Sequence, residues 1–346
     1  MAIVTLGDVA IESRETWKSD KNNIPIVGLE HLEPGEISLS KWDINSDNTF
    51  TKMFRKGQVL LGRRRVYLRK AVFAPTDGIC SGDITVIEAI PGKILPELLP
   101  FIIQNDRFFD YAMQGSAGSL SPRVKWEHLK DYKFQLPNLE EQKALADKLW
   151  SAYNLKSSYN KLLAATDEMV KSQFIEMFEG DKYPKTRLGD FVSIRTGKLD
   201  ANASSENGKY PFFTCGVETL KIDDYAFDCE AVLLAGNGEF CVKYYNGKFN
   251  AYQRTYVIET LDNNVISVPY LYAWFGQYAK VLRGKAIGGI IKYIKMGDLT
   301  EAKISFPPLE VQNSYVAIAQ QADKSKFELG KSIESIDAVI KSLINS

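Results

Sequence analysis

The most basic stretch of the sequence is the first candidate for chemistry. Residues 52–70 contain eight Lys or Arg residues and no acidic residue. Part of this stretch follows the apolar residues 60–62, which predict the end of a strand and a projecting loop. Arginine binds DNA phosphates and can pair bidentately with guanine in the major groove. The stretch therefore predicts DNA contact, with a solvated charged face as the alternative. The candidate residues are Arg63, Arg64, Arg65, Tyr67, Arg69 and Lys70.

A second group of polar and aromatic residues occurs in the C-terminal half. Gly236-Asn237-Gly238-Glu239 matches residues 62–65 in our alignment of the two halves. Asn and Gln suit adenine, and Arg suits guanine. An ordinary polar hairpin with surface tyrosines is the alternative. The different residue types in the two halves favour two surfaces that read different sequences. The candidates here are Asn237, Lys243, Tyr252, Gln253 and Arg254.

Two glycine-containing loops, 114–119 and 283–289, each precede basic residues. Their backbone amides, together with Arg123, Lys125 and Lys292, could hold phosphates. The glycines could equally serve tight backbone geometry alone. Neither loop fits the G-x-x-x-x-G-K-[ST] pattern, which excludes a nucleotide-binding P-loop.

Catalytic and metal-binding patterns are missing from the sequence. Residues 301–303 (EAK) resemble one end of a nuclease metal site, but they repeat residues 131–133 (DYK) and therefore indicate a structural position. The chain has two histidines and four widely spaced cysteines, so we expect buried free thiols and no zinc site. We predict no catalytic residue and no metal ligand on this chain.

Composition limits the class of protein. The chain has 346 residues, 45% hydrophobic and 25% charged, with zero net charge. These values predict a globular protein of two or three domains that does not coat nucleic acid over its whole surface. The first residues do not resemble a signal peptide, and no apolar run approaches 18 residues. We therefore expect a cytoplasmic, soluble protein without a membrane partner.

An internal repeat must position these candidate residues. Residues 135–142 (QLPNLEEQ) recur 170 residues later as 305–312 (SFPPLEVQ), and the same offset relates Lys156 to Lys326 and Asp167 to Asp337. Each copy follows several short apolar runs and one longer run of helical spacing, at 96–114 and 269–282. The repeat predicts two α/β units of short strands and one packed helix each.

A long amphipathic run follows each copy of the repeated motif. Asn138 is a suitable N-cap for the first run, and Gly180 and Pro184 end it. Matched polar residues, among them Gln142 and Gln312, interrupt both apolar seams and are expected to set the register between the helices. We predict an α+β tandem repeat whose two long helices pack as an antiparallel coiled coil with pseudo-two-fold symmetry. The expected domains are 1–137, 138–180, 181–307 and 308–346.

This tandem order resembles the specificity subunit of type I restriction-modification enzymes. The resemblance rests on the L-G-D starts at 6–8 and 188–190, the glycine loops, the L-P-x-L-x-E-Q motif and the long helices, and it covers nearly the whole chain. The second copy departs from the pattern, because it reads Leu309-Glu310-Val311-Gln312 and its glycine loop lacks the serine.

The resemblance implies two target-recognition domains that each read half of a split, asymmetric site in double-stranded DNA. It also implies a complex with two methyltransferase subunits and, optionally, a restriction-translocase subunit. S-adenosylmethionine, ATP and magnesium would belong to those partners, and this chain would bind no cofactor. One alternative is the same subunit type in another kind of restriction system. A second is a two-headed coiled-coil scaffold that binds proteins, and a stand-alone nuclease is not expected.

Overall fold

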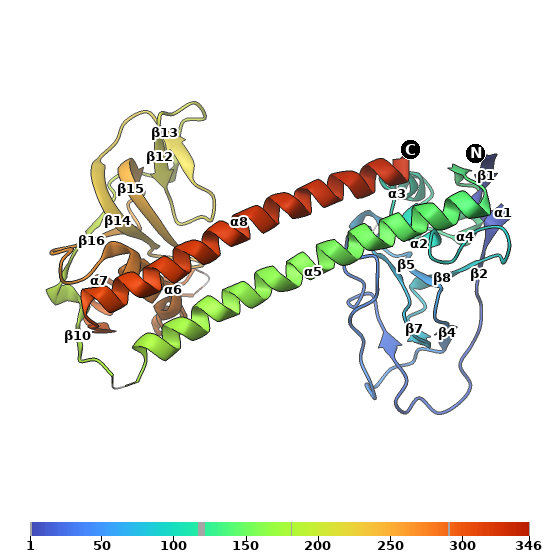
Figure 1. Cartoon of the computed structure of the whole chain (residues 1–346), viewed down its shortest axis with the longest axis horizontal. Helices are drawn as coiled ribbons and strands as arrows, with labels where there is room; N and C mark the ends of the chain where they lie inside the picture. The colour runs from blue at the N-terminus through green and yellow to red at the C-terminus, as the bar shows by residue number, and fades with distance from the viewer. Residues whose placement is uncertain (1, 117–121, 181, 290, 346) are drawn as a thin grey trace. The chain divides into compact units, whose positions relative to one another are not determined.

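The computed structural model describes residues 2–116, 122–180, 182–289 and 291–345. The chain divides into two compact units, and each contains part of both long helices. The first unit comprises Met1–Asn160 and Gly330–Ser346, and the second comprises Lys161–Leu329. Figure 1 shows the order of the helices and strands along the chain.

Besides its parts of the two long helices, the described portion of the first unit contains three small sheets and four short helices. The strand orders are β1-β9, β2-β8-β5-β6 and β3-β7-β4. Leu60, Leu61 and neighbouring strand residues are fully buried between these sheets and the helices. The strands are β1 Ala2–Thr5, β2 Ala10–Glu12, β3 Ile26–Val27, β4 Lys52–Phe54, β5 Val59–Gly62, β6 Ala71–Phe73, β7 Gly78–Cys80, β8 Ile84–Ala89 and β9 Lys133–Leu136. The helices are α1 Leu6–Val9, α2 Leu99–Ile103, α3 Asp106–Gln114 and α4 Trp126–Leu129, with a 3-10 turn η1 at Val66–Leu68.

The single helix predicted over 96–114 is in fact two. Asn105 is extended between α2 and α3, with φ −66° and ψ 139°. Its side-chain oxygen accepts a hydrogen bond from the backbone N–H of Arg107 and so caps α3. The apolar spacing on its own did not show this break.

The second unit has a larger sheet. Its six-stranded sheet has the order β11-β16-β14-β15-β12-β13, and β10 pairs with β17. The strands are β10 Lys185–Arg187, β11 Val192–Thr196, β12 Tyr210–Phe213, β13 Leu220–Ile222, β14 Phe227–Ala235, β15 Val242–Ala251, β16 Thr255–Thr260 and β17 Lys303–Ser305. The helices are α6 Val268–Lys285 and α7 Met296–Thr300, with 3-10 turns η2 Leu188–Asp190 and η3 Ala201–Ala203.

The long helices α5 (Leu139–Phe178) and α8 (Leu309–Asn345) follow the repeated motif, as predicted. Asn138 caps α5, since its side chain accepts from the N–H of Glu141, whose carboxylate accepts from the N–H of Asn138. The portions of the two helices in each unit run antiparallel. In the first unit Leu149 and Leu343 line one cavity, whereas Lys156 meets Asp337 further along. In the second unit Asp167 meets Lys326, and Phe174 packs against Tyr315. The predicted α+β tandem repeat with antiparallel long helices is confirmed.

The matched glutamines have a different role from the one expected. Gln142 accepts from the N–H of Leu95 and donates to the carbonyls of Lys93 and Pro137. Gln142 is 1% exposed, and its three partners lie in the globular part of the first unit and at the helix start. It does not set the helix–helix register. Instead it fastens the beginning of α5 to the segment before α2.

Gln312 makes the same three contacts at the beginning of α8. Its side chain accepts from the N–H of Ser267 and donates to the carbonyls of Val265 and Pro307. Gln312 is fully buried. Each buried glutamine thus satisfies three backbone groups in partly buried surroundings, where a polar group without a partner is energetically costly.

Matched lysines and aspartates form reciprocal ion pairs between α5 and α8. Lys156 Nζ lies 2.6 Å from Asp337 Oδ1 in the first unit. Lys326 Nζ lies 3.0 Å from Asp167 Oδ1 in the second, and it also pairs with Asp323 at 2.8 Å. The polar interruptions at these positions do lie between the helices, as predicted for a seam.

A double-mutant cycle on Lys156→Ala and Asp337→Ala is expected to give a coupling of about 0.5–1 kcal/mol in unfolding free energy, because the pair is partly exposed and screened by solvent. The measurement is denaturant unfolding of the wild type, both single variants and the double variant. A coupling that persists in 1 M salt would contradict an electrostatic origin.

None of the four cysteines, all of which lie in the described residues, forms a disulfide. All four are free thiols, as predicted, but only Cys80 is buried, and burial raises its pKa to about 12. Within the described ranges no group of three or more His, Cys, Asp or Glu side chains could hold a metal ion. Among those residues, no helix is long and apolar enough to cross a membrane.

Candidate nucleic-acid interface

Backbone hydrogen bonds join three segments where β5 ends in the first unit. The N–H of Arg63 donates to the carbonyl of Asp83 at 3.0 Å, and the N–H of Arg65 donates to Pro122 at 2.9 Å. The N–H of Val124 donates back to the carbonyl of Arg63 at 3.0 Å. The predicted basic loop is therefore held in a fixed conformation. We call residues 63–65, 83 and 122–124 the first junction.

The side chains of the first junction gather around one carboxylate. Arg123 donates from Nε to Asp83 Oδ1 at 2.8 Å and from Nη2 to Oδ2 at 3.3 Å. Arg64 Nη1 lies 3.7 Å from the same Oδ2. The hydrogen bonds from Arg123, together with the nearby charges of Arg64 and Arg63, hold the pKa of Asp83 below its ordinary value. Several cationic side chains thus converge on one partly buried acid.

The second unit has the same backbone arrangement where β14 ends. The N–H of Gly236 donates to the carbonyl of Arg254 at 2.7 Å, and the N–H of Gly238 donates to Lys292 at 3.1 Å. The N–H of Ile294 donates back to Gly236 at 3.0 Å. We call residues 236–238, 254 and 292–294 the second junction. Its hydrogen bonds repeat those of the first junction one for one.

Strand register fixes the correspondence between the two junctions. Gly62 pairs with Ile84 across β5 and β8, and Ala235 pairs with Thr255 across β14 and β16. Gly236 therefore corresponds to Arg63, and the sequence-based match of Gly236 to Gly62 was wrong by one residue. The ladder gives these further correspondences, first junction before second: Arg64 and Asn237, Arg65 and Gly238, Asp83 and Arg254, Arg123 and Tyr293.

One position of each junction has left-handed backbone. Arg65 has φ +54°, and the corresponding Gly238 has φ +74°. Left-handed conformations are common for glycine and rare for other residues. The shared conformation shows that the backbone path is the same although the side chains differ.

The remaining candidates in the first unit differ in how far the protein already engages them. Tyr67, in η1, and Lys125, at the start of α4, are exposed. Arg69 forms ion pairs with Asp106 and Asp110 on α3. Lys70 Nζ donates to the carbonyl of Leu29 at 2.7 Å. Arg69 and Lys70 therefore already hold parts of the unit together.

Two candidates in the second unit also form hydrogen bonds within the protein. Lys243 donates from Nζ to the carbonyls of Gly216 and Glu218, at 3.0 and 3.2 Å. Desolvation lowers its pKa, which fits a lysine that fastens a loop. Gln253 donates from Nε2 to Asp200 Oδ2 at 3.2 Å and is exposed.

The structure brings three of the second-unit candidates together. Asn237, Arg254 and Lys292 all belong to the second junction, and Tyr252 and Gln253 immediately precede Arg254. Arg254 and Lys292 are exposed, whereas Asn237 and Tyr252 are half-buried. Lys243, on β15, is not part of this junction.

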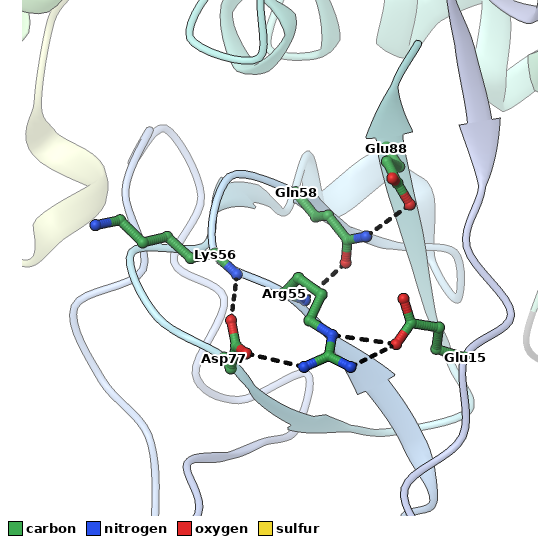
Figure 2. Close-up of polar contacts among 6 residues, drawn as sticks. All are labelled: Glu15, Arg55, Lys56, Gln58, Asp77 and Glu88. Carbon is green, nitrogen blue, oxygen red and sulfur yellow. Dashed lines mark hydrogen bonds and ion pairs between the residues drawn. The ribbon is translucent and has the colours of Figure 1, made fainter. Parts of the chain in front are cut away.

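The early part of the basic stretch is paired internally. Arg55 places its guanidinium between Glu15 and Asp77, at 3.0 and 3.1 Å (Figure 2). The backbone N–H of Lys56 donates to the same Asp77. Lys52 lies 3.5 Å from Glu12. Within residues 52–70, the arginines at 63–65 are therefore the cations that lie together at one place, the first junction.

The predicted glycine loops are only partly placed. Residues 117–119 of the first loop lie outside the described residues. In the second, Gly288 has φ +124°, and a Cβ there would lie 2.5 Å from the carbonyl oxygen of Ile291, so this glycine serves backbone geometry. Arg283 Nη2 donates to the carbonyl of Glu239 at 3.0 Å. For Gly288, the interpretation that the glycine serves backbone geometry alone therefore fits.

Sequence reasoning missed Asp83 and Tyr293. Asp83 precedes β8 in a segment read only as a strand, and its arginine partners lie 19 and 40 residues away along the chain. For Tyr293 a signal was available, since the 170-residue offset relates it to Arg123. Two junctions of equal backbone and different side chains define a protein built from two copies of one α/β scaffold, each of which presents its own set of side chains.

The comparisons agree with this class. The family model for the type I restriction modification DNA specificity domain matches residues 1–164 and 181–336. This chain belongs to that family and carries two copies of its domain.

Individual relatives match over different lengths. The type I restriction enzyme EcoDI specificity subunit of Escherichia coli is 48% identical over 120 residues, which are 35% of this chain and 26% of that protein. A putative type I specificity subunit of Mycoplasma pneumoniae is 25% identical over 224 residues, 62% of this chain and 91% of that protein. The chain thus matches about a quarter of the first of these curated relatives and most of the second.

Solved structures share the fold along the whole chain. The S subunit of a type I restriction-modification system from M. genitalium has a TM-score of 0.70 at 13% identity, covering 99% of this chain and 95% of that one. A chain from a study of complex assembly and conformational transition in the type I system has a TM-score of 0.59 at 18% identity, covering 99% and 96%. These likenesses concern the fold alone.

Proposed function

We propose that this chain is the DNA-recognition subunit of a type I restriction-modification complex and reads a split, asymmetric site in double-stranded DNA. Residues 1–137 and 181–307 would form the two target-recognition domains, and the long helices, at 138–180 and 308–346, would space them. The observation that carries the proposal is the pair of junctions, because one backbone scaffold presents different polar side chains in each head.

The chemistry of the two junctions suits different bases. Arg64 and Arg123 offer planar guanidinium groups, which pair bidentately with guanine or hold phosphates. Asn237 offers an amide, which suits adenine, and Arg254 offers a further guanidinium. Two heads of different chemistry would make the whole site asymmetric.

The other candidates are proposed to contact DNA around the junctions, mainly at phosphates. Exposed cations next to a reading surface position the duplex without carrying sequence information. Lys243, Arg69 and Lys70 would have to leave internal partners, so we place them last in this set. Besides Arg64, Arg123, Asn237 and Arg254, the proposed contacts are Arg63, Arg65, Tyr67, Arg69, Lys70, Lys125, Lys243, Tyr252, Gln253 and Lys292.

Partner subunits would supply the chemistry of the complex. We propose two methyltransferase subunits, with a restriction-translocase subunit as an optional addition, and a cytoplasmic location. S-adenosylmethionine, ATP and magnesium would bind to those partners. This chain would choose the site at which they act.

Selection from random-sequence duplex DNA, with the chain in complex with its methyltransferase partner, tests the proposal. The expected result is one split motif with two different halves, and binding that weakens steeply with salt as bound cations release counterions. Selection of no motif, with binding that is absent or independent of salt, would instead favour a protein-binding scaffold.

A further inference from the structure

Asp83 is the acidic residue of the first junction, and its surroundings are unusual for a surface that binds a polyanion. Its side chain is 19% exposed, whereas those of Arg64 and Arg123 are 40% and 48% exposed. The carboxylate occupies one edge of the Arg123 guanidinium with two hydrogen bonds, Nε to Oδ1 and Nη2 to Oδ2. The rest of that guanidinium can still meet a ligand.

Fold stability gives little reason for this arrangement. Ion pairs between groups as exposed as these arginines make at most a modest contribution to stability, because solvent screens them and the side chains lose freedom. The two-bond geometry of Arg123 places this pair at the upper end of the range for such pairs. A carboxylate beside a DNA surface also repels phosphates. Asp83 thus adds little to the stability of the fold and weakens non-specific binding to DNA. A different contribution of Asp83 is needed to explain its place in the junction.

Comparison of the two junctions shows where that acid occurs. The position of Asp83 in the first junction is taken by Arg254 in the second. The positions of Arg64 and Arg123 are taken there by Asn237 and Tyr293. The carboxylate is therefore present in the junction that has arginines at both places, and a cation replaces it in the junction that does not.

We propose that Asp83 is a positioning residue that sets the sequence specificity of the first head, an inference that rests on the proposed DNA-reading function. Asp83 holds Arg123, and with it Arg64, in one orientation, so that each guanidinium presents a fixed edge to a base pair. It also competes with phosphates for these arginines. On DNA without the motif, the arginines could gain only contacts with phosphates. These contacts would not compensate for the loss of the hydrogen bonds to Asp83.

Asp83→Asn tests this role, and Asp77→Asn is the matched control. Asp77 also accepts from an arginine, Arg55, but it precedes β7 whereas Asp83 follows that strand. Asp77 thus lies outside the first junction. Each variant removes one negative charge from the first unit. The assay measures the affinity of the complex for the selected wild-type motif and for a scrambled duplex, over a range of salt concentrations. A thermal unfolding curve checks that each variant is folded.

For Asp83→Asn, the ratio of motif to scrambled affinity is expected to fall by about tenfold, the size of one lost base discrimination. Binding to scrambled DNA should tighten, and its salt dependence should steepen by about one phosphate contact, because a freed arginine can bind phosphate. Repeated selection with the variant should lose sequence preference in one half of the motif only. Asp77→Asn should leave the ratio within about twofold of the wild type.

Three results would overturn the inference. One is a folded Asp83→Asn variant with an unchanged affinity ratio. Another is an equal fall of the ratio in both variants, which would show a general charge effect. The third is a wild-type complex that selects no motif, which overturns the proposed function as well, whereas the first two leave that function intact.

Discussion

Replacing the three arginines that follow β5 is expected to abolish recognition of one half of the split motif. The variant combines Arg63→Ala, Arg64→Ala and Arg65→Gly, because glycine retains the left-handed backbone at position 65. Each lost arginine contact is worth about 1–3 kcal/mol, so affinity for the motif should fall by at least about 100-fold. Methylome mapping of cells that carry the whole system, with wild-type or variant chain, measures the loss directly.

A charge-matched control distinguishes recognition from net charge. Lys18, Lys41 and Lys93 are exposed in the same unit and outside the junction. Their combined replacement by alanine removes the same charge and is expected to leave the methylated motif unchanged. If the arginine variant supports normal methylation of the motif, Arg63, Arg64 and Arg65 do not contact DNA, whatever the control shows.

The second large effect is expected from the buried glutamines at the starts of the long helices. Gln312→Leu keeps roughly the same volume, but it leaves the N–H of Ser267 and the carbonyl of Val265 without partners. A buried unpaired backbone group costs about 1–3 kcal/mol. Gln312→Leu should therefore lower the unfolding free energy of the second unit by about 2–4 kcal/mol, measured by denaturant unfolding. Gln142→Leu should do the same in the first unit.

An exposed glutamine on the same helix provides the control. Gln321 lies on α8 with its side chain exposed. Gln321→Leu is expected to change the unfolding free energy by less than about 0.5 kcal/mol. Equal effects of Gln312→Leu and Gln321→Leu would mean that the three hydrogen bonds of Gln312 do not stabilise the head on its helix.

The long helices were predictable because they repeat a strong local signal. A long 3.6-residue periodicity that follows both copies of the repeated motif predicted the two helices, and the repeated order of globular unit and helix predicted their antiparallel packing. Shorter elements escaped, since strands such as β4 and β7 have three residues each and too few positions to show a period. The break at Asn105 was missed because apolar spacing continues through it.

The candidate site was predictable only in part, for a similar reason. The arginines at 63–65 form a local cluster that composition reveals. Asp83 and Arg123 join them through hydrogen bonds between segments far apart in the chain, and no local pattern reports such contacts. Gln142 looked like a helix–helix residue because its position in the seam does not show that its side chain turns toward the globular part of the unit.

The left-handed backbone shared by Arg65 and Gly238 limits how heads of this kind can diversify. Valine, isoleucine and threonine are strongly disfavoured there, because their branched Cβ clashes with the neighbouring backbone. Glycine, asparagine, aspartate and, at a modest cost, long unbranched side chains are tolerated. A library that varies the two junctions should therefore draw this one position from a smaller set of amino acids than its neighbours. Folded variants with new DNA preferences should be enriched in that set.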